Sequence, residues 1–495
     1  MSKKNIWPVL RMIVFLIQLL FQSMCTTIVL YLDVLPGKYV ALFLGAMVML
    51  AVCTGLLVFL NIRGRIALWR KIVSCVLALT IAFGCGAGFK IALDAQRLVQ
   101  DFTGDASNTR NTYIVVRYDD AAQSVKDTKH YRYGALADFD VEHTQQMQTV
   151  IEQEIGKTPE ITNYDQTPLM VNALYSGEVD ALIMNGVSIT LLLEQSGFEN
   201  FLTHVRLLYT LPYQDVQEEN KGNNSVREEP FVVYISGSDT RSALLTGGLS
   251  DVNILAVVNP NTRQILLVNT PRDYYIPNPA GKGALDKLTH CANYGVDCSI
   301  EALSTLYNTE INYYGRINFT GFKKLIDAVG GVTVNVDHAF TAISGDYFKK
   351  GENTLNGELA LTFARERHRV KDGDAGRGRN QMKVITAVIN KLSSSKTLIA
   401  NYADILDSLE GMFVTNFTTE EISDLVKMQM DNMTPWNVQS YAVTGTGGME
   451  ETYSWKGQAL SVMWPNEDTV NYGKTLISRV LNGETLTAED MIMPK

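Results

Sequence analysis

Three long uncharged stretches near the start of the chain constrain its fold more than any other feature. They cover Met12–Leu32, Tyr39–Ile62 and Ile72–Phe89, and are 21, 24 and 18 residues long. An apolar run of about 18 residues or more can cross a bilayer as a helix. A cleaved signal peptide would have a single, shorter apolar core. The sequence therefore predicts a membrane anchor over residues 1–96, with three transmembrane helices.

The distribution of charge indicates how this anchor is oriented. Residues 1–100 hold ten of the 43 Lys/Arg but only two of the 52 Asp/Glu, so the rest of the chain is strongly acidic. Basic residues precede the first stretch and separate the second from the third: Lys3, Lys4, Arg11, Arg63, Arg65, Arg70 and Lys71. By the positive-inside rule the N-terminus is cytoplasmic, and everything after about residue 96 lies outside the cell membrane. An acidic exported part argues against a nucleic-acid partner and hence against a transcriptional regulator.

The exported part divides into two α/β units. Residues 97–212 alternate short apolar runs with helical patterns, with strands expected at 113–117 and 181–184 and helices at 144–155 and 187–194. The polar residues 213–229 read as a linker. The second unit, residues 230–485, mixes strand-like and helical segments in an order that favours a sheet covered on both faces. Its strands are expected at 231–236, 252–258, 265–268 and 332–336, and its helices at 299–307, 319–329 and 381–392.

Two of the six cysteines, Cys291 and Cys298, lie in the exported part. Outside the membrane, cysteines seven residues apart can pair as a disulfide, and the alternative is two unpaired thiols. No C-x-x-C or Cys/His spacing indicates a zinc site.

Arginines cluster in one short segment of the second unit, residues 365–379 (RERHRVKDGDAGRGR). If 365–369 is extended, the guanidinium groups of Arg365, Arg367 and Arg369 share one face. Because arginine binds phosphate oxygens in a bidentate manner, five arginines against one lysine favour a phosphate-sized anion. A solvated charge run, paired with nearby carboxylates, is an equally weighted alternative.

Two aspartates fit the same picture. Asp239 follows the strand expected at 231–236, and Asp251 opens the next strand. The end of one strand and the start of its neighbour can lie side by side, and paired carboxylates beside phosphates commonly hold Mg²⁺. Arg272 follows a third strand, at the end where open α/β sheets bind ligands.

Residues 228–480, which contain these arginines and aspartates, resemble the LytR–CpsA–Psr family of envelope glycopolymer transferases. The resemblance rests on ordered blocks: 237–241 (GSDTR), 250–253 (SDVN), 269–273 (NTPRD), 287–290 (KLTH), 327–336 (DAVGGVTVNV), 355–367 (LNGELALTFARER) and 374–381 (DAGRGRNQ). The order of a membrane anchor, an accessory domain and a catalytic domain looks like that of the capsule-attaching branch of the family. The implied fold is α/β: an α-β-α sandwich with a mixed central sheet, preceded by a small α/β accessory domain and transmembrane helices.

The resemblance also implies roles for individual residues. Asp239 and Asp251 correspond to the family's acidic pair, which holds Mg²⁺ on a pyrophosphate. The phosphate-binding residues correspond to Arg272, Arg365, Arg367, Arg377 and Gln381, with Arg241 nearby. The family usually has an arginine two residues before the second aspartate, where this chain has Leu249. Arg241, Arg369 or Arg379 are candidates to replace it.

The implied reaction is Mg²⁺-assisted transfer of a glycan-phosphate, from a capsular or teichoic-acid-like polymer, to a peptidoglycan hydroxyl in a Gram-positive-type envelope. The donor is a polyprenyl pyrophosphate, so a pyrophosphatase side activity is also implied. Asp239 and Asp273 are alternative general bases. The lipid tail needs an apolar tunnel, for which the helices expected at 299–307 and 319–329 are candidates. The alternative, which is favoured for most of their residues, is that they pack in the core. A non-catalytic sensor or scaffold that binds the lipid pyrophosphate is the main rival interpretation, supported by Leu249.

Overall fold

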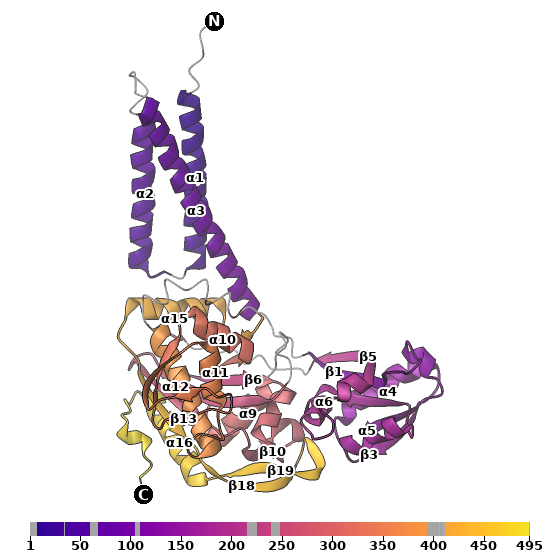
Figure 1. Cartoon of the computed structure of the whole chain (residues 1–495). Coiled ribbons are helices and arrows are strands. Elements are labelled where there is room, and N and C mark those ends of the chain that lie inside the picture. Colours follow the sequence, from indigo (N-terminus) through magenta and orange to yellow (C-terminus); the bar gives the residue numbers. More distant parts are fainter. Residues whose placement is uncertain are drawn as a thin grey trace.

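The computed structural model describes residues 7–33, 35–59, 68–103, 109–214, 225–238, 248–393, 405, 409 and 411–494. Figure 1 shows an N-terminal stalk of helices, a larger domain at the end of the stalk, and a small domain beside it. Most of the predicted linker lies outside the described residues. Strand β5 of the small domain ends at Gln214, and β6 of the larger domain begins at Phe231.

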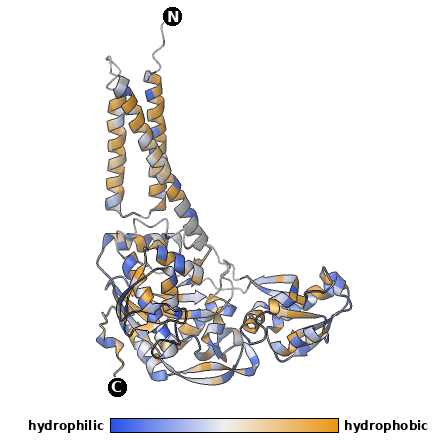
Figure 2. Cartoon of the chain, in the orientation of Figure 1, coloured by the Kyte–Doolittle hydropathy of each residue, from blue (hydrophilic) through white to orange (hydrophobic). Residues whose placement is uncertain are grey.

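The stalk consists of α1 (Trp7–Leu32), α2 (Gly37–Phe59) and α3 (Leu68–Thr103). Each contains a segment apolar and long enough to cross a membrane, so the prediction of three such helices is confirmed. Figure 2 shows hydrophobic residues along most of their length. Helix α3 continues well beyond the predicted end at Phe89, because no Gly or Pro between Lys90 and Thr103 ends it.

Polar side chains inside the stalk bond one helix to another. Gln18 Nε2 donates to Thr54 Oγ1 at 2.9 Å, and Arg11 Nε donates to Ser74 Oγ at 3.2 Å. All four side chains are buried. Since lipid cannot satisfy these groups, the bonds favour association of the three helices into one bundle.

The small domain is a mixed five-stranded sheet with the order β3-β2-β4-β1-β5. Strand β1 is antiparallel to β4 and β5, and β2 is parallel to β3 and β4. All four elements predicted in this domain are present. The bounds are β1 (Thr109–Arg117), β2 (Arg132–Leu136), α4 (Val141–Ile155), β3 (Glu160–Tyr164), α5 (Thr167–Ser176), β4 (Ala181–Asn185), α6 (Gly186–Leu193), α7 (Phe201–His204) and β5 (Val205–Gln214).

The larger domain is built on a mixed six-stranded sheet with the order β16-β11-β6-β7-β8-β17. The pairs β6·β11 and β8·β17 are parallel, and the other three are antiparallel. The strands are β6 (Phe231–Ser238), β7 (Ser250–Asn259), β8 (Gln264–Asn269), β11 (Tyr313–Asn318), β16 (Phe413–Thr415) and β17 (Asn437–Ala442). Every residue of β8 is buried, as expected for a strand covered on both faces.

Helices cover both faces of this sheet. On one face α8 (Leu288–Cys291), α9 (Val296–Tyr307) and α16 (Glu467–Leu481) share a core with Leu255 and Leu266. On the other face α12 (Gly373–Leu392) and α15 (Thr419–Asp431) pack on Ile254 and Leu267. The predicted α-β-α sandwich with a mixed central sheet is therefore confirmed.

Smaller elements complete the larger domain. Helices α10 (Phe319–Ala328) and α11 (Gly357–Arg365) form a further core with the two-stranded sheet β12·β15. The strand predicted at 332–336 belongs to this pair, not to the central sheet. The remaining strands are β9 (Tyr275–Asn278), β10 (Ala284–Lys287), β12 (Val332–Val336), β13 (Phe340–Thr341), β14 (Tyr347–Phe348), β15 (Gly351–Leu355), β18 (Gly445–Thr452) and β19 (Trp455–Pro465).

The predicted disulfide is not formed in this structure. Cys291 and Cys298 are both free cysteines, and both are buried in the core beside α9. The Cys298 thiol donates a hydrogen bond to Asn278 Oδ1 at 3.3 Å. A hydrogen bond between the Cys291 and Cys298 thiols, together with burial, raises the pKa of Cys291. The alternative of two unpaired thiols is the one that the structure has.

Candidate active site

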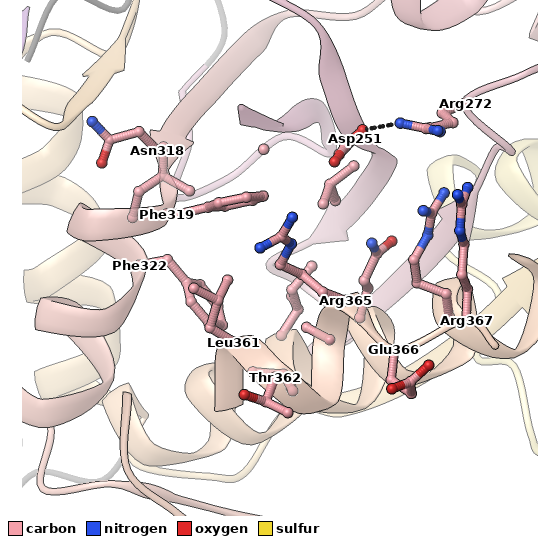
Figure 3. A pocket seen from close by; sticks show the side chains of 18 of the residues that line it. Asp251, Arg272, Asn318, Phe319, Phe322, Leu361, Thr362, Arg365, Glu366 and Arg367 are labelled. Atoms are coloured by element: carbon pink, nitrogen blue, oxygen red, sulfur yellow. Dashed lines mark hydrogen bonds and ion pairs between the residues drawn. The ribbon is translucent and has the colours of Figure 1, made fainter. Parts of the chain in front are cut away.

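A pocket of about 570 Å³ opens between the central sheet and helices α10, α11 and α12. Figure 3 shows charged side chains on one side of it and aromatic and aliphatic side chains on the other. Six residues predicted to form the site line this one pocket: Asp251, Arg272, Arg365, Arg367, Arg377 and Gln381. They come from three separate regions of the sequence, which the fold brings together.

Each charged residue is placed by the end of a helix or strand. Asp251 lies at the start of β7, and Arg272 follows the end of β8. Arg365 is the last residue of α11, and Arg377 lies near the start of α12. The arginines therefore gather after the end of β8, at the end of α11 and near the start of α12, in agreement with ligand binding at the carboxyl ends of strands.

Arg272 is held by two aspartates. Its Nη1 lies 2.6 Å from Asp251 Oδ1, and its Nε lies 3.8 Å from Asp273 Oδ2. Burial lowers the pKa of Arg272, but the two carboxylates outweigh burial and raise the pKa overall. Lys287 Nζ pairs with Asp273 Oδ1 at 2.5 Å. Burial raises the pKa of Asp273, while Lys287 and Arg272 lower it below its usual range, so this carboxylate stays ionised.

Arg377 carries positive charge into a buried part of the pocket. Its guanidinium pairs with Asp374, three residues earlier in α12. The pKa of Arg377 is nevertheless lowered, first by burial and then by the nearby cations Arg272 and Arg367. Burial is the main cause of this lowered pKa, so the guanidinium has lost solvation that a bound anion would replace. Such a site favours an anionic ligand.

Arg365 and Arg367 form no ion pair with any described residue. The Arg365 guanidinium lies over the Phe319 ring, with Cζ 4.4 Å from its centroid. Arg367 Nε contacts His368 Nε2 at 3.3 Å. Both side chains are exposed to the pocket opening. Because neither guanidinium is paired with a described carboxylate, both are available to bind the oxygens of an anion.

Glu366 organises the backbone between these two arginines, and the sequence analysis missed it. Its carboxylate is buried and accepts backbone N–H groups from Ile343, His368 and Arg369 at 2.8, 2.8 and 3.1 Å. In Figure 3 it points away from the guanidinium groups of its neighbours. Burial raises the pKa of Glu366, but these backbone hydrogen bonds lower it overall. The only sequence signal was an acidic residue placed between two arginines.

The hydrogen bonds of the Glu366 carboxylate correct the expectation that residues 365–369 are extended. Residues 365–369 are not extended throughout, because α11 continues to Arg365 and Glu366 bends the segment that follows. Arg365 and Arg367 line the pocket, but Arg369 and Arg379 line a different, neighbouring one. Arg369 and Arg379 therefore do not replace the family arginine missing at Leu249.

Leu249 itself is buried in the core, with 3% of its surface exposed. The buried Arg316 of β11 lies close by, where its Nη2 donates to the backbone oxygen of Gly248 at 3.0 Å. The predicted site residues Asp239 and Arg241 lie outside the described residues.

The opposite wall of the pocket is apolar. It is formed by Ile235 and Ile317 of the sheet, Phe319 and Phe322 of α10, Leu361 of α11, and Val384 and Ile385 of α12. Of the two helices that were candidates for a lipid tunnel, α10 contributes its first turn to this wall. Helix α9 packs in the core on the other face of the sheet, so the core alternative holds for 299–307.

Oxygen ligands suitable for Mg²⁺ are present at the charged side. Asp251 is one, and Ser238, the last described residue before Asp239, pairs with Ser250, the residue before Asp251. Within the described residues, no group of three or more His, Cys, Asp or Glu could hold a metal by itself. To hold a hard cation, Asp251 would therefore need further oxygens, such as those of a bound phosphate.

Tight packing fixes the start of α12 beside the pocket. A Cβ atom added to Gly376 would lie 2.2 Å from the backbone oxygen of Lys371. A methyl group therefore cannot fit at Gly376 unless the start of α12 moves, and Arg377 moves with it. The short distance to the Lys371 oxygen therefore requires glycine at position 376, the first residue of the GRGR sequence.

We expect Gly376→Ala to destabilise the larger domain by about 1–3 kcal/mol, the usual cost of overpacking. Gly447→Ala is a matched control, because a Cβ atom there would meet nothing within 4 Å. Thermal unfolding of the full chain in detergent measures both. Equal melting temperatures for the two variants would contradict the described packing of α12.

Residues 209–468 match the model of the LytR_cpsA_psr family. The polyisoprenyl-teichoic acid–peptidoglycan teichoic acid transferase TagU of Bacillus anthracis is 34% identical over 235 residues, covering 47% of this chain and 75% of the relative. The protein of the same name from Enterococcus faecalis is 34% identical over 248 residues, covering 49% and 80%. The solved structure of the Lin1025 protein from Listeria innocua is 30% identical, covers 51% of this chain and 100% of that chain, and has a TM-score of 0.42.

The matched region includes every strand and helix that contributes to the pocket. It spans more than half of the sequence. The chain belongs to the LytR_cpsA_psr family.

Proposed function

We propose that this protein transfers a glycan-phosphate from a polyprenyl pyrophosphate to a hydroxyl group of peptidoglycan. The observation that carries the proposal is the two-sided pocket, in which an apolar wall faces a group of arginines. A lipid pyrophosphate has the same two-part chemistry, with an apolar tail joined to a compact, highly charged group. The TagU relatives, named as teichoic acid transferases acting on peptidoglycan, support the reaction class.

The arginines supply what this chemistry requires. The acceptor oxygen attacks the glycan-side phosphorus, the bond from that phosphorus to the bridging oxygen breaks, and polyprenyl phosphate leaves with the electron pair. Phosphoryl transfer depends on positioning and on neutralising charge spread over the phosphate oxygens. Arg365 and Arg367, which are free of carboxylates within the described part, bind those oxygens, and Arg377 and Arg272 approach from the sheet side.

The acceptor hydroxyl must lose a proton to a base. Asp273 is poorly suited, because its carboxylate pairs with Lys287 and Arg272 and it does not line the pocket. Of the two candidates from the sequence, this favours Asp239.

Asp251 and Asp239 would hold Mg²⁺, which when bound supplies additional positive charge to the pyrophosphate. We expect EDTA to abolish transfer and added Mg²⁺ to restore it.

The orientation of the stalk gives this site access to its lipid substrate. Near the turn between α1 and α2, Asp33 pairs with Lys427 Nζ at 2.6 Å, and Lys38 pairs with Asp431 at 3.5 Å. The larger domain thus contacts the end of the stalk that the positive-inside rule places outside the cell. We infer that the pocket works in the extracytoplasmic space, close to the membrane that holds the lipid tail.

We expect protease added to intact cells to cleave within residues 213–229 and to release the larger domain from the small one. Loops of this composition are preferred cleavage sites when they are exposed. Immunoblotting against each domain measures the products. Cleavage that occurs only after lysis would contradict the extracytoplasmic assignment.

A direct assay separates an enzyme from a non-catalytic lipid sensor. The full chain in detergent is incubated with a lipid-linked capsular or teichoic-acid-like polymer, peptidoglycan and Mg²⁺, and both polymer-linked peptidoglycan and released polyprenyl phosphate are measured. We expect the two products in equal amounts. Release without linkage would indicate only the pyrophosphatase side reaction, and binding without either product would support the sensor.

A further inference from the structure

A second pocket, of about 270 Å³, adjoins the arginine segment. Its walls are formed by residues 336–340, residues 369–372 and the start of α12. The same short segment thus borders two hollows in succession: Arg365 and Arg367 line the first, and Arg369 and Lys371 line the second. The reaction proposed above uses the first pocket only.

The charges lining the second pocket are partly paired. Arg379 pairs with Asp372 at 2.6 Å, and Asp337 pairs with Lys383 at 2.7 Å. These pairs neutralise both aspartates of the wall. The guanidinium of Arg369 and the ammonium of Lys371 have no ion-pair partner among the described residues. The pocket therefore carries two cationic groups in excess.

The backbone that presents these cations is fixed. The Arg369 N–H donates to Glu366 Oε1 at 3.1 Å, and the Lys371 oxygen accepts from Arg379 Nη2 at 3.2 Å. Both side chains are exposed. Two unpaired cations on a held backbone bind an anion without first breaking an internal ion pair, which lowers the cost of binding.

We propose that this pocket is a second anion-binding subsite, which takes a phosphate- or carboxylate-bearing unit of a glycan. The proposal rests on the proposed function, because a glycan whose pyrophosphate lies in the first pocket continues as a chain of further units. The second pocket is smaller than the first, and charged residues such as Arg369, Lys371 and Arg379 lie in its wall beside apolar ones such as Phe340 and Val370. The anionic unit comes either from the phosphodiesters of the donor polymer or from the peptide carboxylates of the acceptor.

Binding to the full chain in detergent tests this with three probes. They are a six-unit glycerol phosphate oligomer, a soluble disaccharide–peptide fragment of peptidoglycan, and a short-chain polyprenyl phosphate. The test variant is Arg369→Ala/Lys371→Ala. The control is Lys456→Ala/Lys474→Ala, which removes the same charge from β19 and α16, away from both pockets.

We expect the test variant to bind the oligomer or the peptidoglycan fragment at least about 10-fold more weakly than the wild type, a typical effect of losing charge-assisted hydrogen bonds. Polyprenyl phosphate should bind equally well to all three proteins. Weaker binding of the oligomer assigns the subsite to the donor, and weaker binding of the fragment assigns it to the acceptor.

Three results would overturn the proposal. The first is that the wild type and the test variant bind both glycan probes equally, and the second is that the wild type binds neither probe. The third is that the test variant also loses binding of polyprenyl phosphate, which would place the two residues in the first site. Because only binding is measured, these results do not depend on whether the chain catalyses transfer.

Discussion

Replacing Arg365 by alanine is expected to lower the rate of polymer transfer between about 100- and 1,000-fold, the usual effect of removing one preorganised donor to a developing negative charge. Arg365 forms no ion pair with a described residue, and its guanidinium is held against the Phe319 ring. Removing this side chain should therefore have little effect on the stability of the fold. The loss should appear in kcat more than in the affinity for the lipid substrate.

Two further variants make this test specific. Arg365→Lys keeps the charge but loses the planar fork, so we expect an intermediate loss of about 10-fold. Lys456→Ala removes an exposed cation from β19 and should leave the rate unchanged. Radiolabelled polymer recovered with peptidoglycan measures all of these rates. Transfer by Arg365→Ala at the wild-type rate would remove the arginines from the proposed chemistry.

The arrangement of the site was predictable wherever sequence periodicity fixes secondary structure. The strands at 231–236, 252–258 and 265–268 are clearly apolar, and all three lie in the central sheet. Because β7 and β8 are antiparallel, Asp251 at the start of β7 and Arg272 after the end of β8 lie at the same end of the sheet. The resemblance then supplied the arginines of α11 and α12, which line the same pocket.

What could not be predicted depends on contacts between distant segments. Sequence alternation places Arg369 with Arg365, but a buried carboxylate turns the backbone between them and sends Arg369 to a second pocket. The apolar helix at 299–307 was a candidate for a lipid tunnel, because a core helix and a tunnel wall have the same composition. Only the topology places α9 on the far face of the sheet.

Substitution of Glu366 is expected to have the second large effect on the rate of transfer. We expect Glu366→Gln to lower kcat about 10- to 100-fold, although its carboxylate does not face the guanidinium groups. Oε2 accepts the Ile343 N–H, and Oε1 accepts those of His368 and Arg369. A glutamine has one oxygen, so its NH₂ group must face a backbone N–H on one side or the other. Leaving a buried donor unsatisfied costs about 1–3 kcal/mol and frees the segment that carries Arg367.

The pH dependence of stability checks that the charge of Glu366 is involved. Its pKa is lowered in the folded state, so its contribution to stability is fully present above the unfolded pKa of about 4.3 and is lost as the pH falls through the folded pKa. The difference in unfolding free energy between the wild type and Glu366→Gln should therefore be constant above about pH 5 and should narrow in more acidic solution.

A double-mutant cycle distinguishes a positioning residue from one that only stabilises the fold. If Glu366 acts by holding Arg367, then Arg367→Ala already removes the group that Glu366 positions. The variant Glu366→Gln/Arg367→Ala should then transfer polymer no more slowly than Arg367→Ala alone, because residues that act as one unit are not additive. Losses that multiply would show that Glu366 acts independently of Arg367. In that case the contact with Ile343, at the edge of the pocket, would account for its effect.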